Sequence, residues 1–167
     1  MGREPEPDFF AILRVLTRFG VDFVVVGGVC AVLHGAPLTT FDLDLVHSRS
    51  PDNVRRLLEA LTSLDARYRQ APLRRRRPDS SHLSSPGHQL LMTRYGPLDL
   101  LGMIGKGRTY DELAKQSTEV RLGGRLRVKV LNLEPLIRIK EETAGEKDRA
   151  VLALLRRCLE EKSRKGT

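Results

Sequence analysis

The chain has 167 residues, of which 40% are hydrophobic, and its formal net charge is +8 at pH 7. This length fits one domain, and this composition supplies enough apolar side chains for a core. The absence of any run of about 18 apolar residues excludes a transmembrane helix, and the polar start MGREPEPD is unlike a signal peptide. The positive charge favours a polyanionic partner such as RNA, DNA or a nucleotide, with a basic surface that serves only solubility as an equal alternative.

The first third of the chain predicts helices alternating with strands. Asp8 is placed to cap a helix whose apolar residues have helical spacing over 9–19, and Gly20 ends it. The continuous apolar run over 23–26, preceded by Asp22, predicts a strand over 22–26 that is covered on both faces. The elements expected next are a short helix over 29–33, a strand over 41–46 and a helix over 51–64.

The rest of the chain predicts two hairpins and three further helices, the first of which is short. Residues 70–88 are rich in Arg, Ser and Pro and predict a flexible basic loop. The elements expected after it are a hairpin of 89–93 with 97–101, a helix over 109–115, a hairpin of 119–122 with 125–130, and helices over 132–140 and 146–160. We therefore predict one α/β (α+β) domain over 1–167: a mixed β-sheet with helices packed against it, with its core over about 9–131 and a helical C-terminal part over about 132–160.

The two cysteines, Cys30 and Cys158, lie in apolar segments that are far apart in the sequence. We expect both to be reduced, buried thiols, as in a cytoplasmic protein. No spacing of Cys and His residues indicates a zinc site.

Two glycines, Gly27 and Gly28, separate the apolar strand over 22–26 from the helix that follows it. Without Cβ atoms they let a ligand approach the backbone closely, and free N–H groups at this point favour phosphate. A tight turn with no ligand is the simpler interpretation of a glycine pair at the end of a strand.

Two aspartates, Asp42 and Asp44, lie two residues apart in the next predicted strand, so both side chains are expected on one face. We expect the apolar residues beside them to face the core: Phe41, Leu43 and Leu45. Two like charges so close repel each other, and a divalent cation such as Mg²⁺ or Mn²⁺ would remove the conflict. The alternative is a strand end with two solvated carboxylates.

A third carboxylate, Asp99, lies in the apolar segment GPLDLLG of another predicted strand. By itself it could be a structural hydrogen-bonding group. Together with Asp42 and Asp44 it supplies the carboxylate set that metal-assisted phosphoryl or nucleotidyl transfer needs.

The order of a glycine pair, an Asp-x-Asp about a dozen residues later and a further strand Asp resembles the nucleotidyltransferase superfamily related to DNA polymerase beta. The stretch FVVVGGVCAVLHGAPLTTFDLDLV is similar to small bacterial nucleotidyltransferases of the abortive-infection and toxin–antitoxin type. The later segments LDLLG and LEPLIRIKEETAGEKDRAVLALL strengthen this resemblance, which spans about residues 9–157. It implies the nucleotidyltransferase fold and transfer of a nucleoside monophosphate from a nucleoside triphosphate (NTP) to a hydroxyl acceptor, with tRNA or a protein as the favoured acceptor.

The resemblance also implies roles for individual residues. Asp42, Asp44 and Asp99 would be the catalytic, metal-binding carboxylates, with Asp99 also orienting or deprotonating the acceptor hydroxyl. The backbone of Gly27 and Gly28 would hold the triphosphate. Candidates for neutralising phosphate are Lys140 and Lys147, with Asp148 as an orienting partner. Apart from the resemblance, the arginine cluster itself makes Arg74, Arg75, Arg76 and Arg77 candidates for contacting nucleic acid, with a mobile loop as the alternative.

Two departures from the family pattern keep other functions open. Many relatives have Gly-Ser where this chain has Gly27-Gly28, and many have Arg where this chain has Leu38. One alternative is therefore a non-catalytic nucleotide- or partner-binding member of the same fold, regulatory or antitoxin-like. Another is a basic RNA-binding protein that acts through its arginine cluster.

Overall fold

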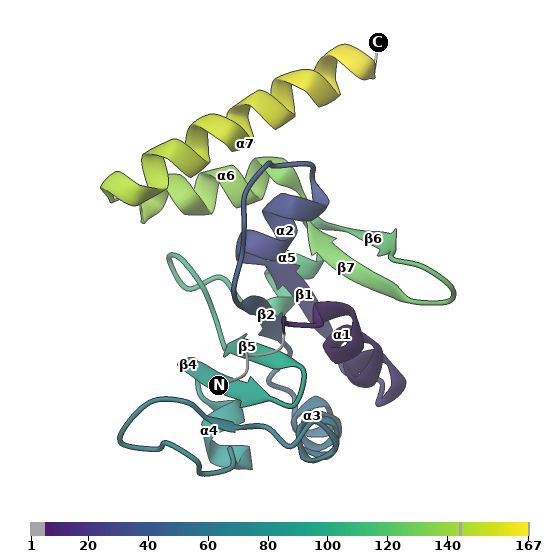
Figure 1. Cartoon of the computed structure of the whole chain (residues 1–167), viewed down its shortest axis with the longest axis vertical. Helices are drawn as coiled ribbons and strands as arrows, with labels where there is room; N and C mark the ends of the chain where they lie inside the picture. The colour runs from purple at the N-terminus through teal and green to yellow at the C-terminus, as the bar shows by residue number, and fades with distance from the viewer. Residues whose placement is uncertain (1–5, 144, 167) are drawn as a thin grey trace.

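The computed structural model describes residues 6–143 and 145–166, which form one mixed seven-stranded β-sheet with seven helices packed around it (Figure 1). The strands are β1 (Phe23–Val26), β2 (Leu43–His47), β3 (Arg67–Tyr68), β4 (His88–Thr93), β5 (Gly96–Leu101), β6 (Ser117–Arg121) and β7 (Arg127–Leu131). The helices are α1 (Phe9–Arg18), α2 (Gly27–Leu33), α3 (Pro51–Ser63), α4 (Ser80–Ser84), α5 (Tyr110–Ala114), α6 (Leu133–Glu142) and α7 (Glu146–Lys165). The predicted fold class is confirmed.

The sheet has the strand order β3-β4-β5-β2-β1-β7-β6. Strand β1 lies in the interior of the sheet beside the central strand β2, antiparallel to β2 and parallel to β7, and every residue of β1 is buried. This burial confirms the prediction of a strand covered on both faces. On its other side β2 runs parallel to β5, and this pairing places two of the predicted carboxylates side by side.

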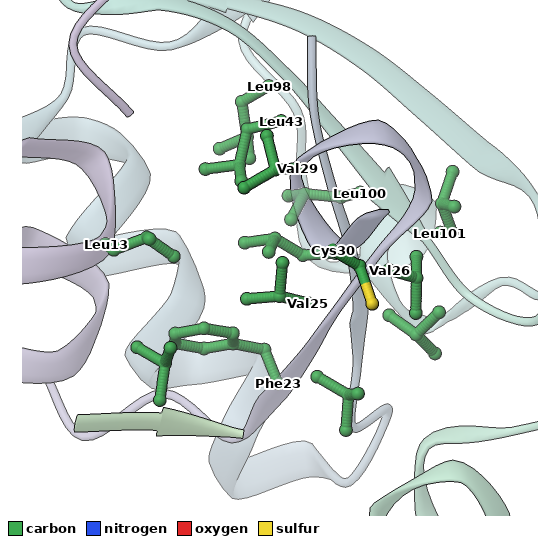
Figure 2. Packing of buried hydrophobic residues seen from close by; sticks show 14 of the residues in the cluster. Leu13, Phe23, Val25, Val26, Val29, Cys30, Leu43, Leu98, Leu100 and Leu101 are labelled. Atoms are coloured by element: carbon green, nitrogen blue, oxygen red, sulfur yellow. The ribbon is translucent and has the colours of Figure 1, made fainter. Parts of the chain in front are cut away.

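The core joins the central strands to the helices that cover them. Figure 2 shows Leu43 of β2 and Leu98 of β5 beside Val29 of α2, and Leu43 and Leu98 are also partners in the sheet. Cys30 lies in the same cluster, and its thiol donates a hydrogen bond to the carbonyl of Leu131 at 3.2 Å. Both cysteines are buried and free, as predicted.

Helices α6 and α7 pack against each other at one end of the molecule, far from α3 and α4 (Figure 1). Helix α7 extends to Lys165, about five residues beyond the predicted end. Among the described residues, no helix combines the length and the apolar content that crossing a bilayer requires.

Three local expectations from the sequence differ from the structure. Helix α2 begins at Gly27, two residues earlier than predicted, so the glycine pair forms its first turn. Strand β2 begins at Leu43, and Phe41 is 73% exposed, so the expectation that Phe41 faces the core was wrong. The basic segment predicted as a loop contains the short helix α4, whose first turn is capped by Asp79.

A buried histidine at the end of β2 gives the fold a testable dependence on pH. The Nε2–H of His47 donates to the carbonyl of Leu83 at 2.8 Å, and its Nδ1 has no hydrogen-bond partner in the described part of the chain. Burial lowers the pKa of His47, and Arg49 lowers it further, whereas the bond to Leu83 opposes the change. The folded protein therefore resists protonation that the unfolded chain accepts.

Because the unfolded chain binds more protons below its His pKa of about 6.5, His47 is expected to lower the stability as the pH falls through that value. Replacing His47 with Phe removes this titration. Below pH 6.5 we therefore expect the wild type to lose free energy of unfolding relative to the variant, by up to about 1.4 kcal/mol per pH unit. Urea unfolding between pH 5.0 and 7.5 measures it, and parallel curves for the two proteins would contradict the prediction.

Candidate functional site

Two of the predicted acids meet because β2 and β5 run parallel in one register. Asp44 of β2 is the direct partner of Asp99 of β5, and the side chains of the two residues are hydrogen-bonded to each other. Asp99 is buried and Asp44 is half-buried. Burial raises the pKa of Asp44 to about 7, with the charges of Asp99 and Asp42 adding to the rise and Lys140 opposing it. The Asp44 carboxyl is therefore partly protonated near neutral pH.

The glycine pair closes this site from the side of α2. Gly27 has φ of +67°, and a Cβ atom added to it would lie 2.2 Å from Oδ2 of Asp44. A Cβ atom on Gly28 would lie 2.6 Å from Oγ1 of Thr40. The Asp44 carboxylate therefore packs directly on the bare backbone of Gly27, and the Thr40 side chain leaves no room for a side chain at Gly28.

Asp42 lies at the edge of the site. It precedes β2, and its side chain is 45% exposed. Its Oδ2 is 4.0 Å from Nη2 of Arg69. Asp42 thus lies just before the strand in which it was predicted, and its charge acts on Asp44.

Arg69 is a site residue that the sequence did not single out. Its Nη1 donates to Oδ1 of Asp99 at 2.5 Å and to the carbonyl of Leu91 at 2.9 Å. Its side chain is only 19% exposed. Arg69 is one of six arginines over 66–77, and nothing in the sequence distinguishes it from the others.

Of the two lysines predicted to bind phosphate, Lys140 is the one whose side chain is described. Its Nζ lies 3.2 Å from Oδ1 of Asp148, so the expected pairing with Asp148 is present. Its charge also acts on Asp44, as the pKa of that carboxyl reflects. Lys147 falls in the first turn of α7, but its side chain lies outside the described part of the chain.

No group of three His, Cys, Asp or Glu side chains within residues 6–143 and 145–166 is arranged as a ready metal site. The donor set nevertheless suits a hard cation, because carboxylate oxygens are the ligands that Mg²⁺ prefers. Burial is the main cause of the raised pKa of Asp44, and the charges of Asp99 and Asp42 add to it, so a cation at this point would favour the ionised carboxylates. Asp44 and Asp99 would hold such an ion, and Asp42 would have to turn inward from its contact with Arg69.

Arg69 also lines an arginine-rich cavity of about 450 Å³, whose lining includes none of the three predicted aspartates. The residues lining it include Arg67, Arg69, Arg74, Arg75 and Arg94, with Asp65 as the one acid in the lining. The predicted cluster over 74–77 is exposed. The backbone of Tyr68, next to Arg69, is hydrogen-bonded to this cluster, because the Tyr68 N–H donates to the carbonyl of Arg76 and the Arg75 N–H donates to the carbonyl of Tyr68.

A larger cavity of about 640 Å³ lies elsewhere, among α2, β6, β7, α6 and α7. His34, at the end of α2, lines it and is held by a 2.7 Å contact between its Nε2 and the carbonyl of Leu131. None of the three predicted catalytic aspartates lines this cavity.

Comparisons with known proteins agree on the architecture. No protein-family model matches the sequence, and no curated protein matches it. A lincosamide antibiotic adenylyltransferase, LnuA, solved with lincomycin bound, aligns with a TM-score of 0.60 and 13% identity over 89% of this chain and 94% of that one. A Thermotoga maritima protein provisionally assigned as a nucleotidyltransferase aligns with a TM-score of 0.51 and 18% identity over 94% of this chain and 88% of that one. Likeness at these identities concerns the fold alone, and the chain has the nucleotidyltransferase fold.

Proposed function

We propose that the protein is a metal-dependent nucleotidyltransferase, which moves a nucleoside monophosphate from an NTP to a hydroxyl acceptor. The observation that carries this proposal is the register pairing of Asp44 with Asp99, which packs a partly protonated acid pair against the bare backbone of Gly27. A fold shared with an adenylyltransferase supports it.

In this proposal Asp42, Asp44 and Asp99 hold Mg²⁺ or Mn²⁺, and the backbone of Gly27 and Gly28 lies along the triphosphate. The bound cation would neutralise the negative charge that develops on the transferred phosphate and on the leaving pyrophosphate. Asp99 accepts the proton of the acceptor hydroxyl, whose oxygen forms a bond to the α-phosphorus. The bond from that phosphorus to the bridging oxygen breaks, and pyrophosphate leaves.

The lysines have the role of binding phosphate in this proposal. Lys140 is the better supported candidate, because its charge already acts on Asp44 and its position is set by Asp148. Lys147 is proposed for the same role from the sequence resemblance alone.

A tRNA end is the acceptor that we propose, because Arg69 connects the acids to an arginine-lined cavity and the arginines over 74–77 are exposed. Arginine clusters bind the phosphate backbone without reading sequence. A hydroxyl on a partner protein is the other acceptor that the sequence resemblance favours. The same resemblance favours a role in a toxin–antitoxin or phage-defence system. Such substrates place the proposed reaction in the bacterial cytoplasm.

The test is incubation of the protein with each of the four labelled NTPs, Mg²⁺ or Mn²⁺, and total tRNA. The expected result is label on tRNA that depends on the metal and appears with release of pyrophosphate. Label on a protein in a cell lysate, but not on tRNA, would mean that the acceptor is a protein and that the proposed reaction is correct. No label on any acceptor with either metal would overturn the proposal.

The arginine cluster gives a prediction on RNA binding. Changing Arg74, Arg75 and Arg76 to Gln is expected to weaken tRNA binding and to reduce the slope of log Kd against log salt by about 2, at about 0.7 per phosphate contact on a flexible strand. The three side chains are exposed, so the fold should tolerate the change. Fluorescence anisotropy with labelled tRNA between 50 and 300 mM KCl measures the slope.

The matched control removes three exposed arginines from α1 and α3, by changing Arg14, Arg18 and Arg55 to Gln. Both triple variants lose the same net charge. Equal salt slopes for the two would show that tRNA responds to the total charge of the protein and not to the cluster.

A second candidate function, a non-catalytic nucleotide- or partner-binding protein, is favoured by the contact of Arg69 with Asp99. Calorimetry separates the two candidates. Nucleotide binding that is independent of metal and survives the change of Asp44 to Asn would favour the non-catalytic function.

A further inference from the structure

We propose that Arg69 is an internal counter-ion of the acid site, and that a divalent cation must displace it to bind. This inference rests on the proposed function, because it concerns how the same three aspartates hold their metal. It assigns Arg69 a role in setting metal affinity that is separate from any contact with substrate.

The geometry places one guanidinium across two of the three acids. Nη1 of Arg69 is 2.5 Å from Oδ1 of Asp99, and Nη2 is 4.0 Å from Oδ2 of Asp42. The Asp99 contact is short and charge-assisted, and both of its side chains are mostly buried, at 19% and 12% exposure. A contact of this kind is stronger than an exposed surface ion pair.

In the part of the chain that the structure describes, no other cation takes the place of Arg69 beside the acids. Arg69 is the only residue there that forms an ion pair with Asp42 or Asp99, and Asp44 forms none. Lys140, the other cation that acts on Asp44, is already paired with Asp148. Arg69 therefore supplies the positive charge that contacts the acid group in the metal-free protein.

A divalent cation held by the same oxygens would lie next to the guanidinium, and the two positive groups would repel each other at short range. Both cannot be held at once without a large loss of favourable interaction. Arg69 also lines the arginine-rich cavity of about 450 Å³, which gives its side chain space to move away from the acids. Metal binding and the Arg69–Asp99 ion pair are thus alternatives.

The experiment measures Mn²⁺ binding without nucleotide, by electron paramagnetic resonance of free Mn²⁺, in the wild type and the Arg69→Gln variant. Because the variant has no charge-assisted bond to break, its Kd for Mn²⁺ is expected to be at least about tenfold lower. Without metal, its midpoint of thermal unfolding is expected below that of the wild type, because the acids lose their counter-ion. Saturating Mn²⁺ should raise that midpoint more in the variant than in the wild type.

Two further variants sharpen the test. Arg55→Gln removes the same charge from an exposed position of α3 and should leave the Kd for Mn²⁺ unchanged. Arg69→Lys keeps the charge but not the forked geometry, and an intermediate Kd is expected. This variant also keeps the inference testable if Arg69→Gln does not fold.

The outcomes distinguish this inference from the proposed function. Mn²⁺ binding that requires Asp44 but has the same or a weaker affinity in Arg69→Gln would overturn the counter-ion role and leave the proposed function standing. An equal gain in affinity in Arg55→Gln would also overturn it, since net charge would then be the cause. No saturable Mn²⁺ binding in the wild type or in either Arg69 variant would overturn both.

Discussion

Replacing Asp44 with Asn is expected to lower nucleotidyl transfer by at least on the order of 10²–10³-fold while the fold is kept or strengthened, since removing one preorganised charge-stabilising group costs this much. Asn has nearly the same shape and can donate a hydrogen bond to Asp99, as the protonated Asp44 does. It also removes a buried charge, together with its repulsion by Asp99 and Asp42, and these are the causes that raise the pKa of Asp44 to about 7. We therefore expect the free energy of unfolding to rise by about 1 kcal/mol, near the value of one pKa unit.

The combination of lost transfer and gained stability is what identifies a functional acid, because an active site keeps charges that the fold alone would not favour. Initial rates of label transfer and urea unfolding at pH 7.5 measure the two quantities. Asp52→Asn is the matched control, since Asp52 is an exposed residue of α3 with a side chain 80% exposed. A loss of stability in Asp44→Asn with unchanged transfer would instead mark the Asp44–Asp99 pair as structural.

The patterns that predicted the fold correctly are those set by local physical chemistry. The run of apolar residues over 23–26 predicts a strand covered on both faces, and β1 is an interior strand in which every residue is buried. The apolar spacing after Asp8 marks α1, and the Asp8 side chain accepts the capping hydrogen bond from Ala11. Each of these signals acts within one or two turns of chain, so a single sequence is enough to detect it.

The sequence pointed to the acids and the glycines of the candidate site but not to Arg69, the cation that contacts the acids. The contact of Arg69 with Asp99 joins residues 30 apart through the position of β3 at the sheet edge, and no local pattern encodes it. The prediction that Phe41 faces the core was wrong for a related reason. An apolar residue just before a strand continues the alternating pattern, but the backbone turns there and Phe41 is exposed.

The glycine pair acquires a specific cause from the structure. The sequence leaves a phosphate cradle and a tight turn as alternatives, and neither predicts a contact with the acids. The space that a Cβ atom on Gly27 would occupy is already filled by the Asp44 carboxylate. The glycine and the aspartate are therefore one packing unit, so a change in one is expected to depend on the other.

Replacing Gly27 with Ala is accordingly expected to lower the free energy of unfolding by about 2–5 kcal/mol and to abolish transfer. A non-glycine residue at φ of +67° costs about 1–2 kcal/mol. The new Cβ would also lie 2.2 Å from Oδ2 of Asp44, and such a clash in a packed site adds about 1–3 kcal/mol. Urea unfolding of the variant and of the wild type measures the total.

Gly124 separates the two contributions, because it has a similar φ of +53° but nothing within 4 Å of an added Cβ. Gly124→Ala should therefore show the backbone cost alone and leave transfer intact. The double variant Gly27→Ala, Asp44→Ala should be more stable than the sum of the two single changes predicts, since removing the carboxylate removes the clash. Two results would contradict this packing: an equal loss of stability in Gly27→Ala and Gly124→Ala, or simple additivity in the double variant. Either would mean that Asp44 does not pack on the backbone of Gly27.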